Sequence, residues 1–328
     1  MKSPGRTIGL LLVLGFTFLL GFQIAAGAAE KEVKFGYLVA NIHDPFAVIM
    51  KEKKYMEAEG LKAKWGEYLA GANLMQHVAS GEVDFAVLGV PPIMIARSQG
   101  VDVIILAGTN TEGSGLVVNP SIKQVKDIDG KTIGTPGIGS IQDAMLTVFE
   151  KKHNIKVKHK PVKVSDMALF LQKGEIDGFI SWEPFPTNAV ELGYGHMIAT
   201  SHDIMPEHQC CAFITRGELI RKDPDTVRKV MRAYMKAFDF NRKNAAEVIE
   251  LEEKVTGMSK KVLNKAVRNV KFPNPPFLHV PSTKELAEGL ISSGKIQPEN
   301  VKDVDKFLGD LYNPSFLKEY ITSTTKGK

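Results

Sequence analysis

The sequence contains few cysteines and little excess of charge. Two cysteines among 328 residues are too few for a disulfide framework or a four-cysteine zinc site. The 42 Lys and Arg residues nearly balance the 37 Asp and Glu residues, and a net charge of +5 is too small for the concentrated basic surface of a nucleic-acid-binding protein. Motifs for a serine nucleophile elbow, a zinc protease or a Walker phosphate loop are also missing, which disfavours an enzyme without excluding one.

Long apolar runs are equally scarce, because only the N-terminus carries one. Basic residues precede an apolar run from Ile8 to Phe22, and the small residues Ala25–Ala29 follow it. This order is typical of a cleaved secretory signal peptide. The run is short for a membrane anchor, and no cysteine follows it closely to carry a lipid. We therefore predict a signal peptide over residues 1–29, cleaved after Ala28 or Ala29, and a soluble periplasmic protein.

The rest of the sequence alternates strand and helix patterns. Strand patterns such as Lys31–Val39 and Val83–Leu88 are each followed by a turn and a helical pattern. This alternation predicts an α/β fold with mostly parallel sheets covered by helices. A hydrophobic content of 44% is enough for one large domain or two medium ones. After residue 208 helical patterns dominate, and an apolar stripe from Val227 to Phe238 indicates a buried helix face.

One local pattern occurs twice. Ser80–Val87 (SGEVDFAV) resembles Lys173–Ile180 (KGEIDGFI), and each is interpreted as a helix end followed by a strand that leads into a proline-bearing turn. The repetition predicts two α/β lobes of similar construction.

The predicted lobes are discontinuous in sequence. We expect residues 30–119 and 210–328, with a helical C-terminal extension, to form lobe one, and residues 120–209 to form lobe two. The helical extension most simply covers lobe one. The chain would cross between the lobes near Asn119 and near Cys210, and two crossings form a hinge.

The turns that follow the strands are the expected ligand-contacting positions, because open parallel sheets bind ligands outside the carboxyl ends of their strands. Several of these turns also begin helices, whose free N–H groups point into the cleft. Gly139-Ser140 is the clearest helix start, although a plain N-cap explains it equally well. Trp182 offers a flat ring for stacking, although a ring that fills the core is the alternative. The predicted ligand-contacting residues are Asn41, His43, Asp44, Asn73, Gly89, Thr109, Glu112, Gly139, Ser140, Trp182, Glu183 and His208.

The stretch His208-Gln209-Cys210-Cys211 admits several interpretations. On a regular strand His208 and Cys210 face one way and Cys211 faces the other, so only two metal donors converge. Zinc requires three or four donors, and we therefore predict no metal site. Packed thiols are the expected state of the two cysteines, with a vicinal disulfide or a ligand contact as alternatives.

A family resemblance rests on five segments, which are Ser80–Gly89, Arg97–Val103, Asp129–Gly134, Gly139-Ser140 and Trp182-Glu183-Pro184. Together they resemble the periplasmic solute-binding proteins of the nitrate/sulfonate/taurine ABC-importer class, which share the thiamine-pyrimidine-synthase-like fold. The resemblance implies a two-lobed type II periplasmic-binding-protein fold. It implies that the protein delivers a small organic anion or heteroaromatic solute to a cognate ABC permease by hinge closure. In the family the first strand's loop, the Gly-Ser helix start and the W-E-P turn line the cleft, which here are Asn41–Asp44, Gly139–Ser140 and Trp182–Glu183.

We expect a monomer that uses no cofactor and binds no nucleic acid, but two alternatives stay open. The first is an enzyme, because fungal pyrimidine synthases share the fold and use a cysteine-rich stretch with a histidine, which His208 and Cys210 resemble in part. The export signal and the smaller number of cysteines argue against it. The second is a binding or sensor protein with no role in transport. The absence of an evident arginine in the predicted cleft turns slightly disfavours a bare inorganic anion as the solute.

Overall fold

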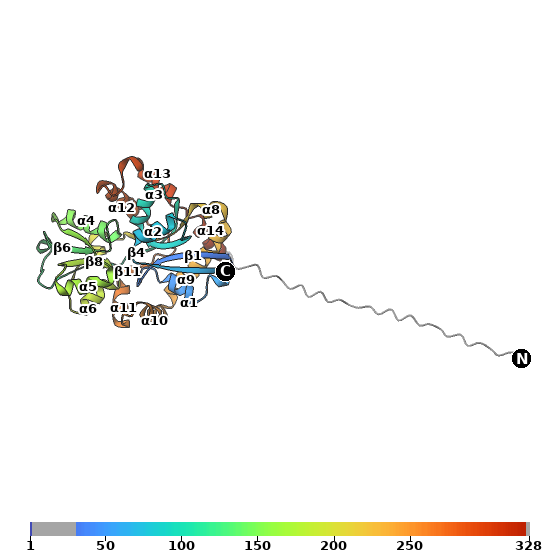
Figure 1. Ribbon diagram of the computed structural model, residues 1–328, viewed down its shortest axis with the longest axis horizontal. Coiled ribbons are helices and arrows are strands. Elements are labelled where there is room, and N and C mark those ends of the chain that lie inside the picture. Colours follow the sequence, from blue (N-terminus) through green and yellow to red (C-terminus); the bar gives the residue numbers. More distant parts are fainter. Residues whose placement is uncertain (2–30, 326–328) are drawn as a thin grey trace.

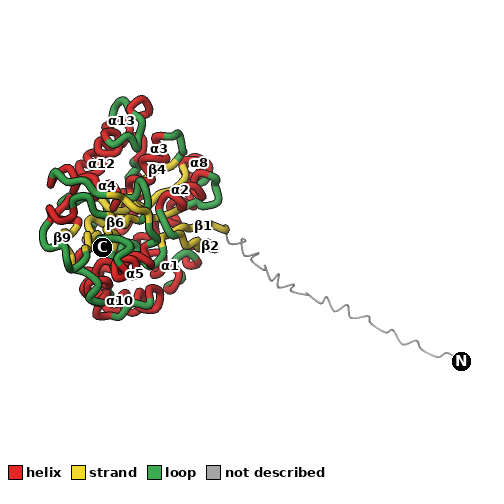
Figure 2. The backbone as a smooth tube through the Cα atoms, turned by 60° about the vertical axis from the view of Figure 1, so that its left-hand side comes forward, coloured by secondary structure: helices red, strands yellow, loops and turns green. Residues whose placement is uncertain are grey.

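The computed structural model describes residue 1 and residues 31–325, so the predicted signal peptide and its cleavage site lie outside the described residues. Within the described part, no helix is both long and apolar enough to cross a membrane. The chain folds into two β-sheets with helices on their outer faces (Figures 1 and 2). We call each sheet, together with the helices that cover it, a lobe.

The first sheet has six strands and the second has five. In spatial order, the first sheet contains β11 (Val270–Lys271), β4 (Val103–Glu112), β10 (Gln209–Arg216), β3 (Phe85–Gly89), β1 (Lys31–Leu38) and β2 (Leu61–Tyr68). The second sheet contains β7 (Lys158–Pro161), β6 (Thr132–Thr135), β8 (Gly178–Trp182), β5 (Ser114–Val118) and β9 (His196–Thr200).

The two sheets share one construction, which confirms the repeat seen in the sequence. Strands β2, β1 and β3 run parallel in the first sheet, and β7, β6 and β8 run parallel at the equivalent places in the second. The next strand of each sheet, β10 or β5, is antiparallel to its neighbours. Each of these two strands follows a crossing between lobes. β10 and β5 each begin at a crossing, at the side of their lobe that faces the other lobe, and run away from it. The parallel strands run the other way and end at that side.

The aspartate of the repeated sequence pattern makes the same pair of hydrogen bonds in both lobes. The Asp84 side chain accepts a hydrogen bond from the Lys34 backbone N–H at 3.0 Å, and the Asp84 N–H donates to the Lys34 carbonyl at 2.9 Å. Asp177 makes the same two bonds with Thr132, at 2.8 and 2.9 Å. The aspartate therefore fixes the start of β3 against β1 in lobe one and the start of β8 against β6 in lobe two.

The first crossing between lobes lies earlier than the sequence indicated. β4 ends at Glu112 and β5 begins at Ser114, so the chain enters the second sheet at Gly113 rather than near Asn119. Glu112 and Gly113 have φ angles of 65° and 99°, a left-handed conformation that turns the strand sharply. The return crossing runs through the residues between α7 (Ser201–Ile204) and β10, close to the expected position.

Helices cover both sheets, and the predicted apolar stripe of the long helix α9 (Pro224–Lys243) is buried. Its Tyr234 ring stacks on Phe213 of β10, with ring centroids 4.3 Å apart. The other lobe-one helices are α1 (Phe46–Glu52), α2 (Gly71–Ala79), α3 (Val90–Ser98), α8 (Gly217–Lys222) and α14 (Ser315–Thr325). Lobe two carries α4 (Ile141–His153), α5 (Val164–Lys173), α6 (Phe185–Glu191) and α7.

The C-terminal helices contact both lobes, whereas the sequence predicted that they cover lobe one. α12 (Val280–Ser292) packs against α3 of lobe one and α4 of lobe two, and α11 (Lys260–Ala266) packs against α6 of lobe two. The Lys295 ammonium, just after α12, lies 2.5 Å from the Asp143 carboxylate of α4. The remaining segment is helical as expected, with α10 (Ala245–Thr256), α11 (Lys260–Ala266), α12 (Val280–Ser292) and α13 (Val304–Leu311).

Candidate functional site

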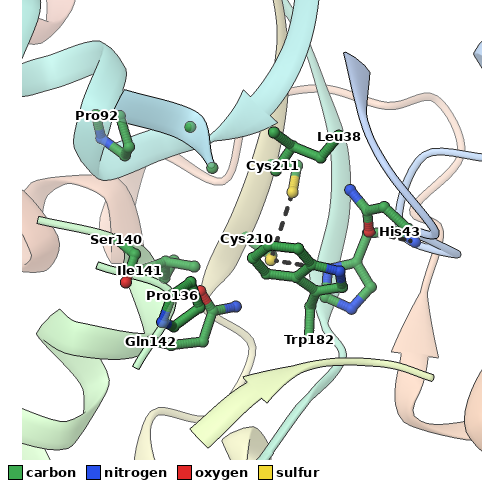
Figure 3. A pocket seen from close by; sticks show the side chains of 13 residues that line it. Leu38, His43, Pro92, Pro136, Ser140, Ile141, Gln142, Trp182, Cys210 and Cys211 are labelled. Atoms are coloured by element: carbon green, nitrogen blue, oxygen red, sulfur yellow. Dashed lines mark hydrogen bonds between the residues drawn. The ribbon is translucent and has the colours of Figure 1, made fainter. Parts of the chain in front are cut away.

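A small cavity lies between the two lobes, at the carboxyl ends of the parallel strands (Figure 3). Its volume of about 20 Å³ leaves room for about one water molecule. Loops after β1, β3, β6 and β8 contribute to the wall, as the strand-end rule predicted. The lining residues are Leu38, Asn41, His43, Gly71, Gly89 and Pro92 from lobe one, Pro136, Ser140, Ile141, Gln142 and Trp182 from lobe two, and Cys210 and Cys211 from β10.

The loop after β1 turns His43 toward this cavity and Asp44 away from it. The Asn41 side-chain oxygen accepts a hydrogen bond from the His43 backbone N–H at 3.0 Å, which closes a local turn. Asp44 is not among the lining residues. Its carboxyl group is buried, neither oxygen has a partner among the described residues, and burial raises its pKa to about 8. Asp44 was predicted to contact ligand, and the structure instead buries it outside the cavity lining.

His43 meets both cysteines at one end of the cavity. Its Nδ1 lies 3.3 Å from the Cys210 sulfur, and the two sulfurs are 3.6 Å apart. Both cysteines are buried, and no disulfide joins them. The hydrogen bond from Cys211, assisted by the nearby His43, lowers the pKa of the Cys210 thiol, and the same hydrogen bond raises the pKa of the Cys211 thiol.

A β-bulge explains why the two thiols converge, contrary to the sequence-based expectation that they face opposite ways. Gln209 pairs with Thr111 of β4 and Cys211 pairs with the adjacent Asn110, so Cys210 is an extra residue without a partner on β4. A bulge breaks the alternation of side chains along a strand. Cys210 and Cys211 consequently both reach the cavity.

The helix start at Gly139-Ser140 is an N-cap, and only Ser140 lines the cavity. The Ser140 hydroxyl accepts a hydrogen bond from the Asp143 N–H at 3.1 Å, and the Asp143 carboxylate accepts one from the Gly139 N–H at 2.9 Å. Burial opposes ionisation of Asp143, but hydrogen bonds from His159 and Lys295 outweigh it and lower its pKa to about 2. The Asp143 carboxylate therefore already occupies a favourable position for an anion at the N-terminus of α4.

The Trp182-Glu183 turn divides its two side chains between the cavity and the protein interior. Trp182 lines the cavity, is 4% exposed, and its Nε1–H has no partner among the described residues. The Glu183 carboxylate faces inward, where it accepts hydrogen bonds from Asn269 at 2.7 Å and from the Thr187 hydroxyl at 2.9 Å. Burial raises the pKa of Glu183. Glu183 thus joins α6 to the segment after α11 and does not line the cavity.

Glu112 belongs to the hinge. Its carboxylate accepts hydrogen bonds from Ser201 at 3.0 Å, from His202 at 2.9 Å and from the Glu207 N–H at 2.6 Å. It therefore ties the first crossing to the return crossing. His208 lies in the return crossing as well, where its Nδ1–H donates to the Met205 carbonyl at 2.8 Å.

Two other predicted residues lie away from the cavity. Thr109 is in the core, with its hydroxyl 3.1 Å from that of Tyr234, and Asn73 is exposed on α2. Of the predicted ligand-contacting residues, the structure gathers Asn41, His43, Gly89, Ser140 and Trp182 around one cavity.

Several lining residues are not among the predicted ligand-contacting residues. Gln142 lies in the first turn of α4, and its amide donates to the Ser114 hydroxyl at 2.9 Å, beside the first crossing. The same strand-end rule, extended by one helical turn, would have found it. The apolar part of the wall carries no chemical signal of its own, and it comprises Leu38, Gly71, Pro92, Pro136 and Ile141.

Comparisons with known proteins agree with this architecture. A taurine-binding periplasmic protein of Escherichia coli K12 is 26% identical over 201 residues, covering 59% of this chain and 62% of that protein. A Bacillus subtilis 168 protein assigned to aliphatic sulfonate binding is 22% identical, covering 97% of this chain and 98% of its own. The crystal structure of the nitrate-binding protein NrtA from Synechocystis PCC 6803 superposes with a TM-score of 0.76 at 14% identity, covering 89% of each chain.

These similar proteins are all named as binding proteins. The structural match shows that the chain has the two-lobed fold of periplasmic binding proteins. A family model described as NMT1-like matches residues 26–251, which is more than two thirds of the sequence, and the chain therefore belongs to the NMT1-like family.

Proposed function

We propose that this protein is the solute-binding component of an ABC importer. It captures a small organic anion or heteroaromatic solute between its lobes and delivers it to a membrane permease by hinge closure. The observation that carries the proposal is the cavity itself, which His43 enters from lobe one and Trp182 from lobe two at strand carboxyl ends. The relatives support it, since they are named for binding taurine, aliphatic sulfonates and nitrate.

The cavity volume supports hinge motion as part of the function. A space of about 20 Å³ is smaller than any solute of these classes, so the lobes must separate before one can enter. The sharp turn at Glu112 and Gly113 and the return crossing near His208 are the segments that would absorb such a rotation. A ligand that touches both lobes then favours the closed state by its differential affinity.

The lining chemistry supports a solute with a flat or apolar part and a hydrogen-bond acceptor. No Lys or Arg is among the lining residues described, so a charged group on the solute would be met by neutral donors. The Trp182 indole supplies apolar area, and its unpartnered N–H gains a hydrogen bond if a solute oxygen reaches it.

Further parts of the proposal are export to the periplasm and a monomeric state. The periplasmic taurine-binding relative supports the first. Light scattering of the purified protein at working concentration would test the second, and a dimer that persists on dilution would contradict it.

Tryptophan fluorescence provides the test of the solute site, because the chain has only two tryptophans. In a Trp65→Phe background Trp182 is the only tryptophan left. Taurine, alkanesulfonates, nitrate and aromatic carboxylates can then be screened by their effect on its fluorescence emission. For a solute that binds, isothermal titration calorimetry, which does not depend on a tryptophan, should show that Trp182→Ala weakens affinity by about 5- to 150-fold, the equivalent of about 1–3 kcal/mol of lost apolar contact.

Trp65→Ala is the matched control, because Trp65 packs on Phe35 and Tyr37 and does not line the cavity. Both truncations lower stability, and only Trp182→Ala should lower the affinity of the folded fraction. An unchanged affinity in folded Trp182→Ala would show that the ring fills the core and that the solute binds elsewhere.

A further inference from the structure

Three strong metal donors converge where the sequence predicted only two. His43 comes from the loop after β1, and Cys210 and Cys211 come from the bulge in β10, so residues 167 positions apart in the chain meet. One donor atom from each residue lies within 4.8 Å of the other two. Figure 3 shows the imidazole and the two thiols together at one end of the pocket, with Ser140 and Pro92 at the other.

The spacing of the donors matches a tetrahedral metal centre. With Zn–S bonds of about 2.3 Å and Zn–N bonds of about 2.0 Å, neighbouring tetrahedral ligands are separated by about 3.5–3.8 Å. The structure has 3.3 Å between His43 Nδ1 and the Cys210 sulfur, and 3.6 Å between the two sulfurs. Small side-chain rotations would bring the third pair into range.

The second nitrogen of His43 is held as in a metal-ligating histidine. Its Nε2–H donates to the Gly113 carbonyl at 2.5 Å, which leaves the Nδ1 lone pair facing the cysteines. A histidine that binds metal usually gives its other N–H to a carbonyl or carboxylate, which fixes the tautomer and the ring orientation. Gly113 permits this close approach, because a Cβ atom there would lie 2.5 Å from Nε2.

We propose that His43, Cys210 and Cys211 form a binding site for a thiophilic divalent metal ion such as Zn²⁺, with the fourth coordination position open to the cavity. Binding forms two metal–sulfur bonds and one metal–nitrogen bond and releases the thiol protons to solvent. The two thiolates neutralise the charge of the ion, which allows it to sit in a buried place. The cavity of about 20 Å³ beside the sulfurs leaves room for one water molecule or one solute donor atom as the fourth ligand.

Titration with metal tests the proposal directly. The purified full-length protein is reduced, stripped with a chelator, and titrated with Zn²⁺ against a chromophoric indicator and with Co²⁺ by absorption spectroscopy. We expect one ion per chain and a thiolate-to-cobalt charge-transfer band in the near ultraviolet. His43→Ala, Cys210→Ala and Cys211→Ala should each weaken Zn²⁺ binding by about 100-fold or more, since even loss of an outer-shell partner weakens metal sites by about 10- to 100-fold.

His77→Ala is the matched control, because His77 pairs with Glu82 on the surface and does not line the cavity. It should leave Zn²⁺ binding unchanged. If folded, reduced wild-type protein binds no stoichiometric ion or gives no charge-transfer band, the proposal is wrong, whatever the variants do. Equal Zn²⁺ affinity in Cys211→Ala and the wild type would overturn it as well.

The metal site and the proposed solute function are tested separately. The fluorescence screen for solutes is run on the chelator-stripped protein and again with Zn²⁺ added. Metal binding without any solute would contradict the proposed function alone, and solute binding without metal binding would contradict the metal site alone.

Discussion

Replacing Glu252 with glutamine measures the free-energy cost of a buried carboxyl group. Glu252 lies on α10, is 2% exposed, and one of its oxygens has no partner among the described residues. Burial, reinforced by the nearby Asp44 carboxyl group, raises its pKa from 4.5 to about 8. Glu252 is therefore mostly protonated at neutral pH in the folded protein and ionised in the unfolded chain.

The sign of the effect follows from proton binding. Between pH 4.5 and about 8 the folded state holds a proton on Glu252 that the unfolded state has lost, so the free energy of unfolding falls as the pH rises. Each pH unit of increase within this interval lowers the free energy of unfolding by about 1.4 kcal/mol. Raising the pH from 5 to 7 should thus destabilise the wild type by about 2.5 kcal/mol relative to Glu252→Gln, which cannot ionise. The buried amide adds a cost of its own, but that cost does not depend on pH.

Urea unfolding of both proteins at pH 5, 6 and 7 gives the required free energies. Glu250→Gln on the same helix is the control, because Glu250 is exposed and pairs with Lys260, and its removal should change stability little at any of these pH values. A stability difference between Glu252→Gln and the wild type that stays constant from pH 5 to 7 would refute the reasoning. It would mean that Glu252 is ionised in the folded protein and has a partner there.

Two further predictions concern the inter-lobe ion pair and the N-terminus. Asp143→Asn should lower the free energy of unfolding at pH 7 by about 2 kcal/mol, because the pKa of Asp143 is about 2 in the folded state and 3.8 ordinarily. The difference in stability between the two proteins is complete above pH 3.8 and disappears as the pH falls through about 2. Denaturant titrations check it, and an Asp143→Asn variant as stable as the wild type at pH 7 would be inconsistent with it. Intact mass spectrometry of the protein recovered from cells should give a chain that begins at Ala29 or Glu30, while a chain that begins at Met1 in a membrane fraction would rule out cleavage.

The strands and the repeated lobes were predictable because their signals are local. The pattern around Asp84 and Asp177 fixes the same two hydrogen bonds in each lobe, so the sequence had to repeat where the structure repeats. The stripe from Val227 to Phe238 likewise reflects one buried helix face. Hydrophobic spacing and turn residues carry such information without reference to distant parts of the chain.

The first crossing was not predictable in the same way. Thr109–Ser114 is polar and resembles a loop, yet β4 continues to Glu112 because β10 pairs along its length. Pairing with a strand about 100 residues away overrides the local preference. Thr109 and Glu112, which were predicted to contact ligand on the strength of that loop, consequently lie in the core and in the hinge.

The bulge at Cys210 could not be predicted from local sequence patterns. The alternation rule assigns neighbouring strand residues to opposite faces, and it led to the expectation of two metal donors. One extra residue against Asn110 and Thr111 reverses that result, because it turns Cys210 and Cys211 to the same side. Nothing in the stretch from His208 to Cys211 marks the bulge, since it arises where β10 leaves the crossing and first meets β4. His43 supplies the third donor from a loop that the sequence predicted to line the cleft. The cluster therefore depends on the relative placement of two segments that are far apart in the chain, which local sequence patterns do not specify.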